Sequence, residues 1–499
     1  MSGSVCASLS VDGDEGSPVQ EDDAVVRSHW PVVGPGGVVS FTANGGTLVF
    51  VHLTDPALAR VQVGIDAAVV ADHHVTIRAT LSDGQVQLSR FHVPPTIAGL
   101  SRLGERLSVF PGVVAVAEPT SMTWLGLHVA LQRAGCDLSL VGTRHSARLR
   151  GAISGKSKSD VIDADVLSLA SDVFALSPLD PPLPAELALR RAVVRRGKLV
   201  IDGNRARRRL ISLARWAFPD VWTAFAGSWP TAIAVLTRWP DLRALAAARR
   251  SSVTAVVAAH TRGVPGVAER AGAIRLAAAA WVEFWDGRLD LEALAWETAE
   301  HLRDITIASE QIERATTQAQ RYWAGLYGDD PLLLSLPGMG PMTAPTIRAF
   351  LGDGTRFVSA KAAASYAGLT PSTWSSGTVV QPSRAITKEG PAVLRLAFYQ
   401  AANGARRVDP QLAAYYQHLM VERGHCHTQA TVAVARKLVE RTWTVLTRGQ
   451  PYQFRDATGQ AVTRTVAKDQ ARHDHAVPDD VRARARARSA ATHRSKLTR

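Results

Sequence analysis

The feature that most constrains the fold is the order of strand-like and helix-like segments between residues 60 and 142. Three segments that alternate polar and apolar residues come first, at 60–66, 74–80 and 84–92. Ser82-Asp83-Gly84 is typical of the turn of a hairpin between the last two. A helical pattern, a short apolar strand, a second helical pattern and a further strand follow, at 96–107, 113–118, 121–134 and 138–142. This order predicts an α/β domain built on one sheet.

The predicted order is that of a ribonuclease-H-like domain, and it places four acids. Asp66 ends the first strand, and Glu118 ends the fourth, which lies beside the first in this topology. Asp160 and Asp163 are three residues apart and therefore share one helix face. Carboxylates that converge in this way can hold two divalent ions for phosphodiester chemistry. The alternative is a helix cap at Asp160 and a solvated side chain at Asp163, and we expect Asp165 at the surface.

The remaining patterns divide the chain into five parts. We expect a disordered extension at 1–55 and the catalytic domain at 56–178, in which a loop from 145 precedes a helix over 160–174. Residues 179–330 predict a helical region, with a basic helix over 185–216, an Ala-rich stretch over 230–285 and a coiled-coil-like helix over 288–325. A mostly helical domain at 331–450 and a polar, basic, flexible tail at 451–499 complete the chain.

The net charge indicates a polyanionic partner. It is +13 although the first 50 residues hold six acidic residues and one basic residue, so the excess of bases lies in the folded part and at the C-terminus. Neutralising phosphates releases counterions, which favours nucleic acid as that partner. Gly338 and Gly340 form a turn like the hairpin of helix-hairpin-helix modules, whose N–H groups bind phosphates. The candidate phosphate contacts are Lys156, Lys158, Arg205, Arg208, Gly338, Gly340, Lys388, Arg436 and Lys437.

Two absences bear on the compartment. No apolar run reaches the roughly 18 residues that a membrane-spanning helix needs. The three cysteines are scattered, which fits a reducing cytoplasm rather than a disulfide framework. We therefore expect a cytoplasmic, nucleoid-associated protein.

Several motifs, in order, resemble one family. Gly64-Ile65-Asp66, Glu118 and the segment 158–164 look like the RuvC-like DEDD domain of insertion-sequence 110 transposases. The second half resembles the C-terminal domain of that family, through segments 336–340, 366–371, 375–377, 386–390 and 433–438. Trp374 stands where the pattern has Tyr and keeps the aromatic bulk.

The resemblance implies a bacterial DNA recombinase that moves an insertion sequence. Asp66, Glu118, Asp160 and Asp163 would bind Mg²⁺, with Mn²⁺ as an alternative. Ser376 would be the nucleophile that becomes linked to DNA, a choice over Ser375 that only the family pattern makes. The family also implies a bridge RNA that pairs with target and donor DNA, and a dimer or tetramer in which the acids of one subunit face the serine of another.

Two other functions remain open at this point. One is a RuvC-like nuclease that cleaves branched DNA with water in place of Ser376. The other is a catalytically inactive relative that only binds nucleic acid, in a salt-dependent manner.

Overall fold

The chain forms two compact units, residues 1–181 and 182–499. The computed structural model describes residues 33–34, 38–42, 48–52 and 58–497, except 111, 156, 158, 226–227, 262–265, 373–374, 377–378 and 381–384. Among these residues, no helix is both long and apolar enough to cross a bilayer.

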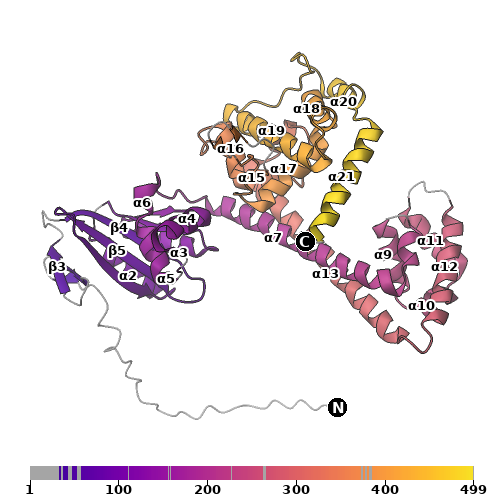
Figure 1. The fold of residues 1–499 in the computed structure, drawn as a ribbon, viewed down its shortest axis with the longest axis horizontal. Coiled ribbons are helices and arrows are strands. Elements are labelled where there is room, and N and C mark those ends of the chain that lie inside the picture. Colours follow the sequence, from indigo (N-terminus) through magenta and orange to yellow (C-terminus); the bar gives the residue numbers. More distant parts are fainter. Residues whose placement is uncertain are drawn as a thin grey trace, which may run out of the picture. The chain divides into compact units, whose positions relative to one another are not determined.

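The first unit is built on a five-stranded mixed sheet (Figure 1). Its strands lie in the order β6-β5-β4-β7-β8, with β4, β5 and β6 antiparallel and β4, β7 and β8 parallel. The elements are β4 (Leu58–Asp66), β5 (His73–Leu81), β6 (Val86–Val93), α2 (Ile97–Leu107), β7 (Val114–Ala117), α3 (Thr123–Arg133), β8 (Asp137–Leu140), α4 (Thr143–Ser154), α5 (Asp160–Ser168) and α6 (Ala170–Val173). The predicted strand order is confirmed.

Alternating side chains of this sheet supply the core of the first unit. Ile65, Ile77 and Leu138 point from the strands into a cluster that includes Leu103 of α2 and Leu127 of α3, and all five are almost fully buried. Because α2 and α3 cover one face, the other face is left for α5. The acidic helix therefore packs directly on β4 and β5.

Two predictions about the helices of the first unit are wrong. The loop expected after residue 145 is helix α4, and the single helix expected over 160–174 is interrupted at Leu169 between α5 and α6. Part of the expected disordered extension also forms strands, β1 (Val33–Gly34), β2 (Val38–Thr42) and β3 (Leu48–His52), in one antiparallel sheet. Their sequences, Val-Val-Ser-Phe-Thr in β2 and Leu-Val-Phe-Val-His in β3, are rich in the β-branched and aromatic residues that strands favour.

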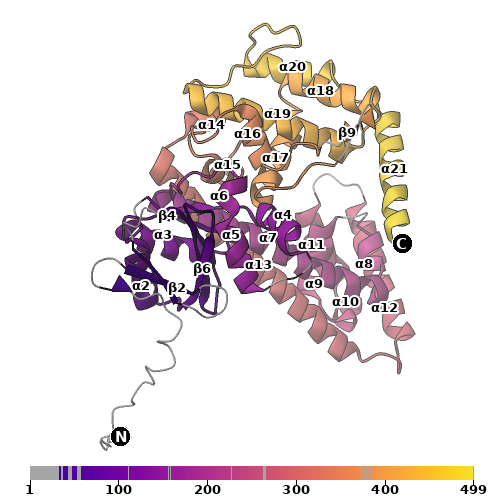
Figure 2. The same ribbon diagram turned by 60° about the vertical axis from the view of Figure 1, so that its left-hand side comes forward.

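The second unit is mostly helical, and two long helices, separated in the chain by several shorter ones, lie side by side in it (Figures 1 and 2). Helix α7 (Pro184–Ala217) pairs antiparallel with α13 (Leu291–Tyr327), since Arg196 donates to Thr316 at 2.8 Å and Arg209 to Asp304 at 3.4 Å. The apolar stripe on α13, which includes Leu302, Ile305 and Ala319, is buried within the chain. The coiled-coil-like spacing therefore has an intramolecular partner.

The chain between the two long helices forms its own cluster at one end of the pair. It contains α8 (Asp220–Thr223), α9 (Trp229–Arg238), α10 (Leu242–Ala247), α11 (Arg250–His260) and α12 (Val267–Phe284). The Ala-rich stretch is therefore helical, as predicted.

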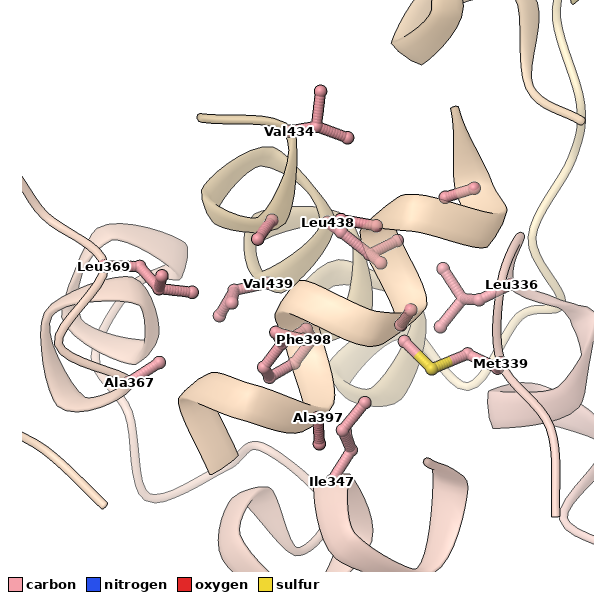
Figure 3. Packing of buried hydrophobic residues seen from close by; sticks show 14 of the residues in the cluster. Leu336, Met339, Ile347, Ala367, Leu369, Ala397, Phe398, Val434, Leu438 and Val439 are labelled. Atoms are coloured by element: carbon pink, nitrogen blue, oxygen red, sulfur yellow. The ribbon is translucent and has the colours of Figure 1, made fainter. Parts of the chain in front are cut away.

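The C-terminal part packs around Phe398, which Figure 3 shows among Ala397, Val439 and Ile347 of α15. Its elements are α14 (Pro331–Ser335), α15 (Ala344–Leu351), α16 (Ala360–Tyr366), β9 (Ser375–Ser376), β10 (Val379–Val380), α17 (Ala392–Ala405), α18 (Pro410–Val421), α19 (His427–Arg448), α20 (Arg464–His473) and α21 (Asp479–Leu497).

The flexible tail expected at 451–499 is wrong for most of its length. Helices α20 and α21 lie there, and Ala467, Ala471, Val481 and Ala485 are buried against the domain. Small apolar residues among many charges supply this packing face.

Candidate active site

Two of the predicted acids follow neighbouring strands. Strand β4 runs parallel to β7, and Ile65 pairs with Ala117 in the register. Asp66 is the last residue of β4, and Glu118 comes directly after β7. The carboxyl ends of parallel strands meet at one sheet edge, so the backbone brings these two residues to adjacent positions.

Glycine at position 64 lets α5 approach β4 closely enough to bring the other two acids to the same edge. A Cβ atom at Gly64 would overlap the carbonyl oxygen of Ala164 and the amide nitrogen of Ser168. Helix α5 begins at Asp160, where the Ser159 hydroxyl accepts the N–H of Ile162 at 3.2 Å. Asp160 and Asp163 therefore lie in the first turn of a helix that crosses β4.

Asp165 anchors this helix to the sheet. Its carboxylate accepts from Nε and Nη2 of Arg90 at 2.9 and 2.8 Å and from the hydroxyl of Thr76 at 2.8 Å. Asp165 was expected at the surface, but its side chain is only 24% exposed. Its side chain points toward β5 and β6 rather than toward the four acids, and it fixes how α5 lies on the sheet.

The four acids have partners that sequence reasoning did not identify. Arg150 of α4 donates to Asp163 at 2.6 Å, and both side chains are largely buried. The Ser146 hydroxyl donates to Glu118, and His74 lies 3.7 Å from Asp160. These partners come from an element predicted as loop and from the neighbouring strand β5, so spacing along the chain carries no signal for them.

The charges show that the acids converge on Arg150. Its pKa is raised, first by the hydrogen bond to Asp163 and also by the negative charges of Asp163, Glu118 and Asp66. Three of the four predicted carboxylates therefore favour a positive charge at the position of the Arg150 guanidinium.

The donor set fits a divalent metal. Carboxylate oxygens are the ligands that Mg²⁺ and Mn²⁺ prefer, and the charges of Asp163, Glu118 and Asp66 all favour a cation at the position of Arg150. Among the described residues, no three acidic, histidine or cysteine side chains lie close enough to coordinate one ion as they stand. Arg150 and Ser146 engage two of the carboxylates instead, so metal binding at this edge requires those contacts to open.

Removing Arg150 is therefore expected to strengthen metal binding. A hydrogen bond to a charged group is worth about 1.5–3 kcal/mol, so Arg150→Gln should bind Mn²⁺ about tenfold more tightly or better. Isothermal titration of the full chain with Mn²⁺ measures this, with Arg133→Gln, an exposed change on α3, as the control. An unchanged or weaker affinity in Arg150→Gln would show that the arginine does not compete with metal.

Ser376 belongs to the second unit, in a segment that we call the serine hairpin, residues 368–390. Its two arms are paired near the base, where the N–H of Thr387 donates to Thr370 at 2.9 Å and that of Ser372 to Ala385 at 3.0 Å. Toward the tip, Ser376 of β9 pairs with Val379 of β10. The side chain of Ser376 lies outside the described residues, so only its backbone position is established.

Close packing holds the base of the serine hairpin. A Cβ atom at Gly390 would overlap the carbonyl oxygen of Tyr366, and one at Gly368 would lie 2.7 Å from Nη1 of Arg395. Arg395 of α17 also donates to the Gly390 carbonyl at 3.3 Å. The motifs around 366–371 and 386–390 thus have a structural role, because their close contacts hold the base of the serine hairpin between α16 and α17.

Several candidate phosphate contacts have other partners. Arg205 pairs with Asp202 at 2.9 Å, and Arg436 and Lys437 both lie 3.4 Å from Glu440. Arg208 is exposed on α7, and Lys388 is exposed at the base of the serine hairpin with a φ of 56°. Lys156 and Lys158 lie outside the described residues.

The Gly338 turn has a packing role. Its φ is +75°, and a Cβ atom there would overlap the Ala401 carbonyl oxygen of α17. The N–H of Gly340 donates to the Thr343 hydroxyl at 3.1 Å, which leaves that N–H engaged within the turn. Phosphate binding by Gly338 and Gly340 stays a prediction, and the close approach of α17 explains Gly338 without it.

Two family models match the chain. Residues 63–219 match the DEDD transposase model of IS110, and residues 330–417 match the model described as transposase, IS116/IS110/IS902 family. A RuvC-like domain followed by a largely helical remainder, as predicted, is confirmed. The chain belongs to the IS110/IS116/IS902 family of transposases.

The similar proteins agree with this assignment. An uncharacterised 43.6 kDa protein of insertion element IS110 from Streptomyces coelicolor is 37% identical over 26% of this chain and 31% of its own length. The pilin gene-inverting protein of Moraxella lacunata is 32% identical over 25% of this chain and 38% of its own. These two alignments span about a third of each relative.

Longer alignments have lower identity. An uncharacterised 44.8 kDa protein of insertion element IS116 from Streptomyces clavuligerus is 26% identical over 78% of this chain and 94% of its own length. Among solved structures, RuvC of T. thermophilus in complex with a Holliday junction substrate is 16% identical, covering 24% of this chain and 99% of that chain, with a TM-score of 0.17.

Proposed function

We propose that the protein is a DNA transposase that cleaves and exchanges strands of an insertion sequence with Mg²⁺ or Mn²⁺. The observation that carries this proposal is the convergence of Asp66, Glu118 and Asp163 around one cationic position at the edge of a RuvC-like sheet. Membership of a transposase family supports it. The basic net charge favours DNA as the substrate.

In the proposed reaction, Asp66, Glu118, Asp160 and Asp163 would hold the divalent ions. Bound metal neutralises phosphate charge and lowers the pKa of an attacking oxygen. The hydroxyl of Ser376 would attack the DNA phosphorus and lose its proton, while the displaced strand leaves as a hydroxyl after taking up a proton. The serine–phosphate ester retains the energy of the phosphodiester, so rejoining to a second strand needs no high-energy cofactor.

Guidance by a bridge RNA and assembly into a dimer or tetramer belong to the same proposal. They rest on the family resemblance. The basic charge of the chain suits an RNA partner as well as DNA. A discrete RNA that co-purifies with the chain would support the guided form.

Replacing Ser376 by Ala tests the covalent step. The wild-type chain with Mg²⁺ and element-end DNA is expected to form a protein–DNA adduct that survives denaturing electrophoresis, and Ser376→Ala is expected to form none. Ser375→Ala is the matched control, because it removes the adjacent hydroxyl and should keep the adduct. Cleavage without adduct that persists in Ser376→Ala would instead indicate a hydrolytic nuclease.

A further inference from the structure

A cavity of about 970 Å³ opens in the C-terminal part of the second unit. It lies among the end of α17 and helices α18, α19, α20 and α21, and Figure 2 shows α21 running down beside this group. No Asp or Glu is among the described residues that line it. Its cationic side chains are Arg406, Arg407, Lys468, Arg472, Arg482 and Arg486.

These charges lack balancing acids. Among the described residues, only Arg482 of this set has an acidic partner, Asp479 at 3.8 Å, and that aspartate is almost fully exposed. Arg482 and Arg486 are four residues apart on α21, a spacing at which like charges lie close enough to repel each other. Burial lowers the pKa of Arg406, and the charges of Arg407 and Arg482 lower it further. An anion in the cavity would relieve this repulsion.

The wall of the cavity also carries polar side chains that contact one another. The Arg406 guanidinium stacks 4.4 Å from the centre of the Tyr416 ring, and its buried Nε has no hydrogen-bond partner among the described residues. The hydroxyl of Tyr416 is 2.8 Å from Nδ1 of His427, at the start of α19. Helix N-termini carry partial positive charge, which adds to that of the arginines.

We propose that this cavity, the C-terminal basic pocket, binds the sugar-phosphate backbone of a nucleic-acid strand, DNA or RNA. A single phosphate would fill only a small part of it, whereas cations from several helices suit successive phosphates of one strand. The wall that α17 and the start of α18 form lies within residues 330–417, which match the family model. The parts of the pocket formed by α19, α20 and α21 lie outside that range. This inference deepens the proposed function and rests on it for the choice of nucleic acid.

Salt-dependent binding tests the pocket. The full chain, freed of bound nucleic acid on heparin, is titrated against a fluorescein-labelled 20-nucleotide single-stranded RNA and the DNA of the same sequence, in EDTA at several NaCl concentrations. Arg472→Gln/Arg486→Gln should weaken binding about tenfold or more and reduce the slope of log Kobs against log salt by about 1.4, or about 0.7 for each lost phosphate contact. Both side chains are exposed, so folding should be unaffected.

A matched pair on one helix isolates the pocket from net charge. Arg486→Gln and Arg484→Gln each remove one positive charge from α21, but only Arg486 lines the cavity. Weaker binding in Arg486→Gln alone supports the proposal. Equal effects of the two variants, or displacement of the oligonucleotide by poly-glutamate at equal charge, would overturn it. If Arg486→Gln loses affinity equally for both oligonucleotides, the pocket contacts the backbone that DNA and RNA share. If it loses affinity for RNA alone, the pocket holds an RNA strand.

The assay also separates this proposal from the proposed function. It involves no cleavage and is run in EDTA, so binding in the pocket does not require a working catalytic site. A chain that shows pocket-dependent binding but no strand transfer would contradict the transposase activity and leave the pocket standing.

Discussion

Asp66→Asn is expected to reduce Mg²⁺-dependent cleavage and strand transfer by about 10³-fold or more. The substitution keeps the shape of the side chain and removes the charge. Asp66 ends β4 beside Glu118, and its charge acts on the same cationic position as those of Glu118 and Asp163. Loss of one carboxylate therefore weakens the field that would hold a divalent ion. Time courses of cleavage and joining on labelled element-end DNA measure the effect.

Asp72→Asn is the control for this substitution. Asp72 is exposed in the turn between β4 and β5, six residues from Asp66 in the same domain. The same chemical change there should leave activity within twofold of wild type. If Asp66→Asn retains a tenth or more of wild-type activity, this edge of the sheet is not the catalytic centre.

The sheet was predictable from sequence because its strands carry regular patterns. Alternation predicts β4, β5 and β6, and the apolar run at 113–118 predicts the doubly covered strand β7. Helix α4 was missed because its sequence, from Thr143 to Ser154, has several basic residues and few apolar ones. Its buried residues are Ser146 and Leu149 alone, too few for a visible period.

The C-terminal helices were missed for a related reason. A tail rich in Arg and Ala reads as solvated, and the burial of Ala467, Ala471 and Ala485 depends on the surface of α18 and α19. Such packing is a tertiary effect, in which small side chains allow close approach. The C-terminal basic pocket forms only because α20 and α21 pack against α18 and α19. The sequence alone therefore does not show that its cationic residues lie together.

The candidate site likewise has a part that sequence predicts and a part that it does not. The four acids follow from strand ends and one helical spacing, so they can be named without coordinates. Arg150 and Ser146, which hold Asp163 and Glu118, come from α4, and the contacts arise from folding alone. The proposed nucleophile could not be predicted from the chemistry of the residues, because Ser-Ser-Gly is a common turn sequence and only the family pattern selects Ser376.

Gly64→Ala is expected to destabilise the first unit by about 3 kcal/mol or more, which lowers its Tm by roughly 6–12 °C. The added methyl group would overlap backbone atoms of Ala164 and Ser168, which cannot rotate away as a side chain can. Helix α5 must therefore shift from β4, and it carries Asp160 and Asp163 with it. Calorimetry measures the stability, and titration with Mn²⁺ should show weaker binding in the fraction that stays folded.

Gly151→Ala separates this steric effect from the general effect of replacing glycine. Gly151 lies inside α4, and a Cβ atom there meets nothing within 4 Å. Alanine in a helix interior is favoured over glycine by roughly 0.5–1 kcal/mol, so this variant should be slightly more stable than wild type. If Gly64→Ala matches wild type in both Tm and Mn²⁺ affinity, α5 does not depend on glycine at this contact. The four acids would then need another explanation for their convergence.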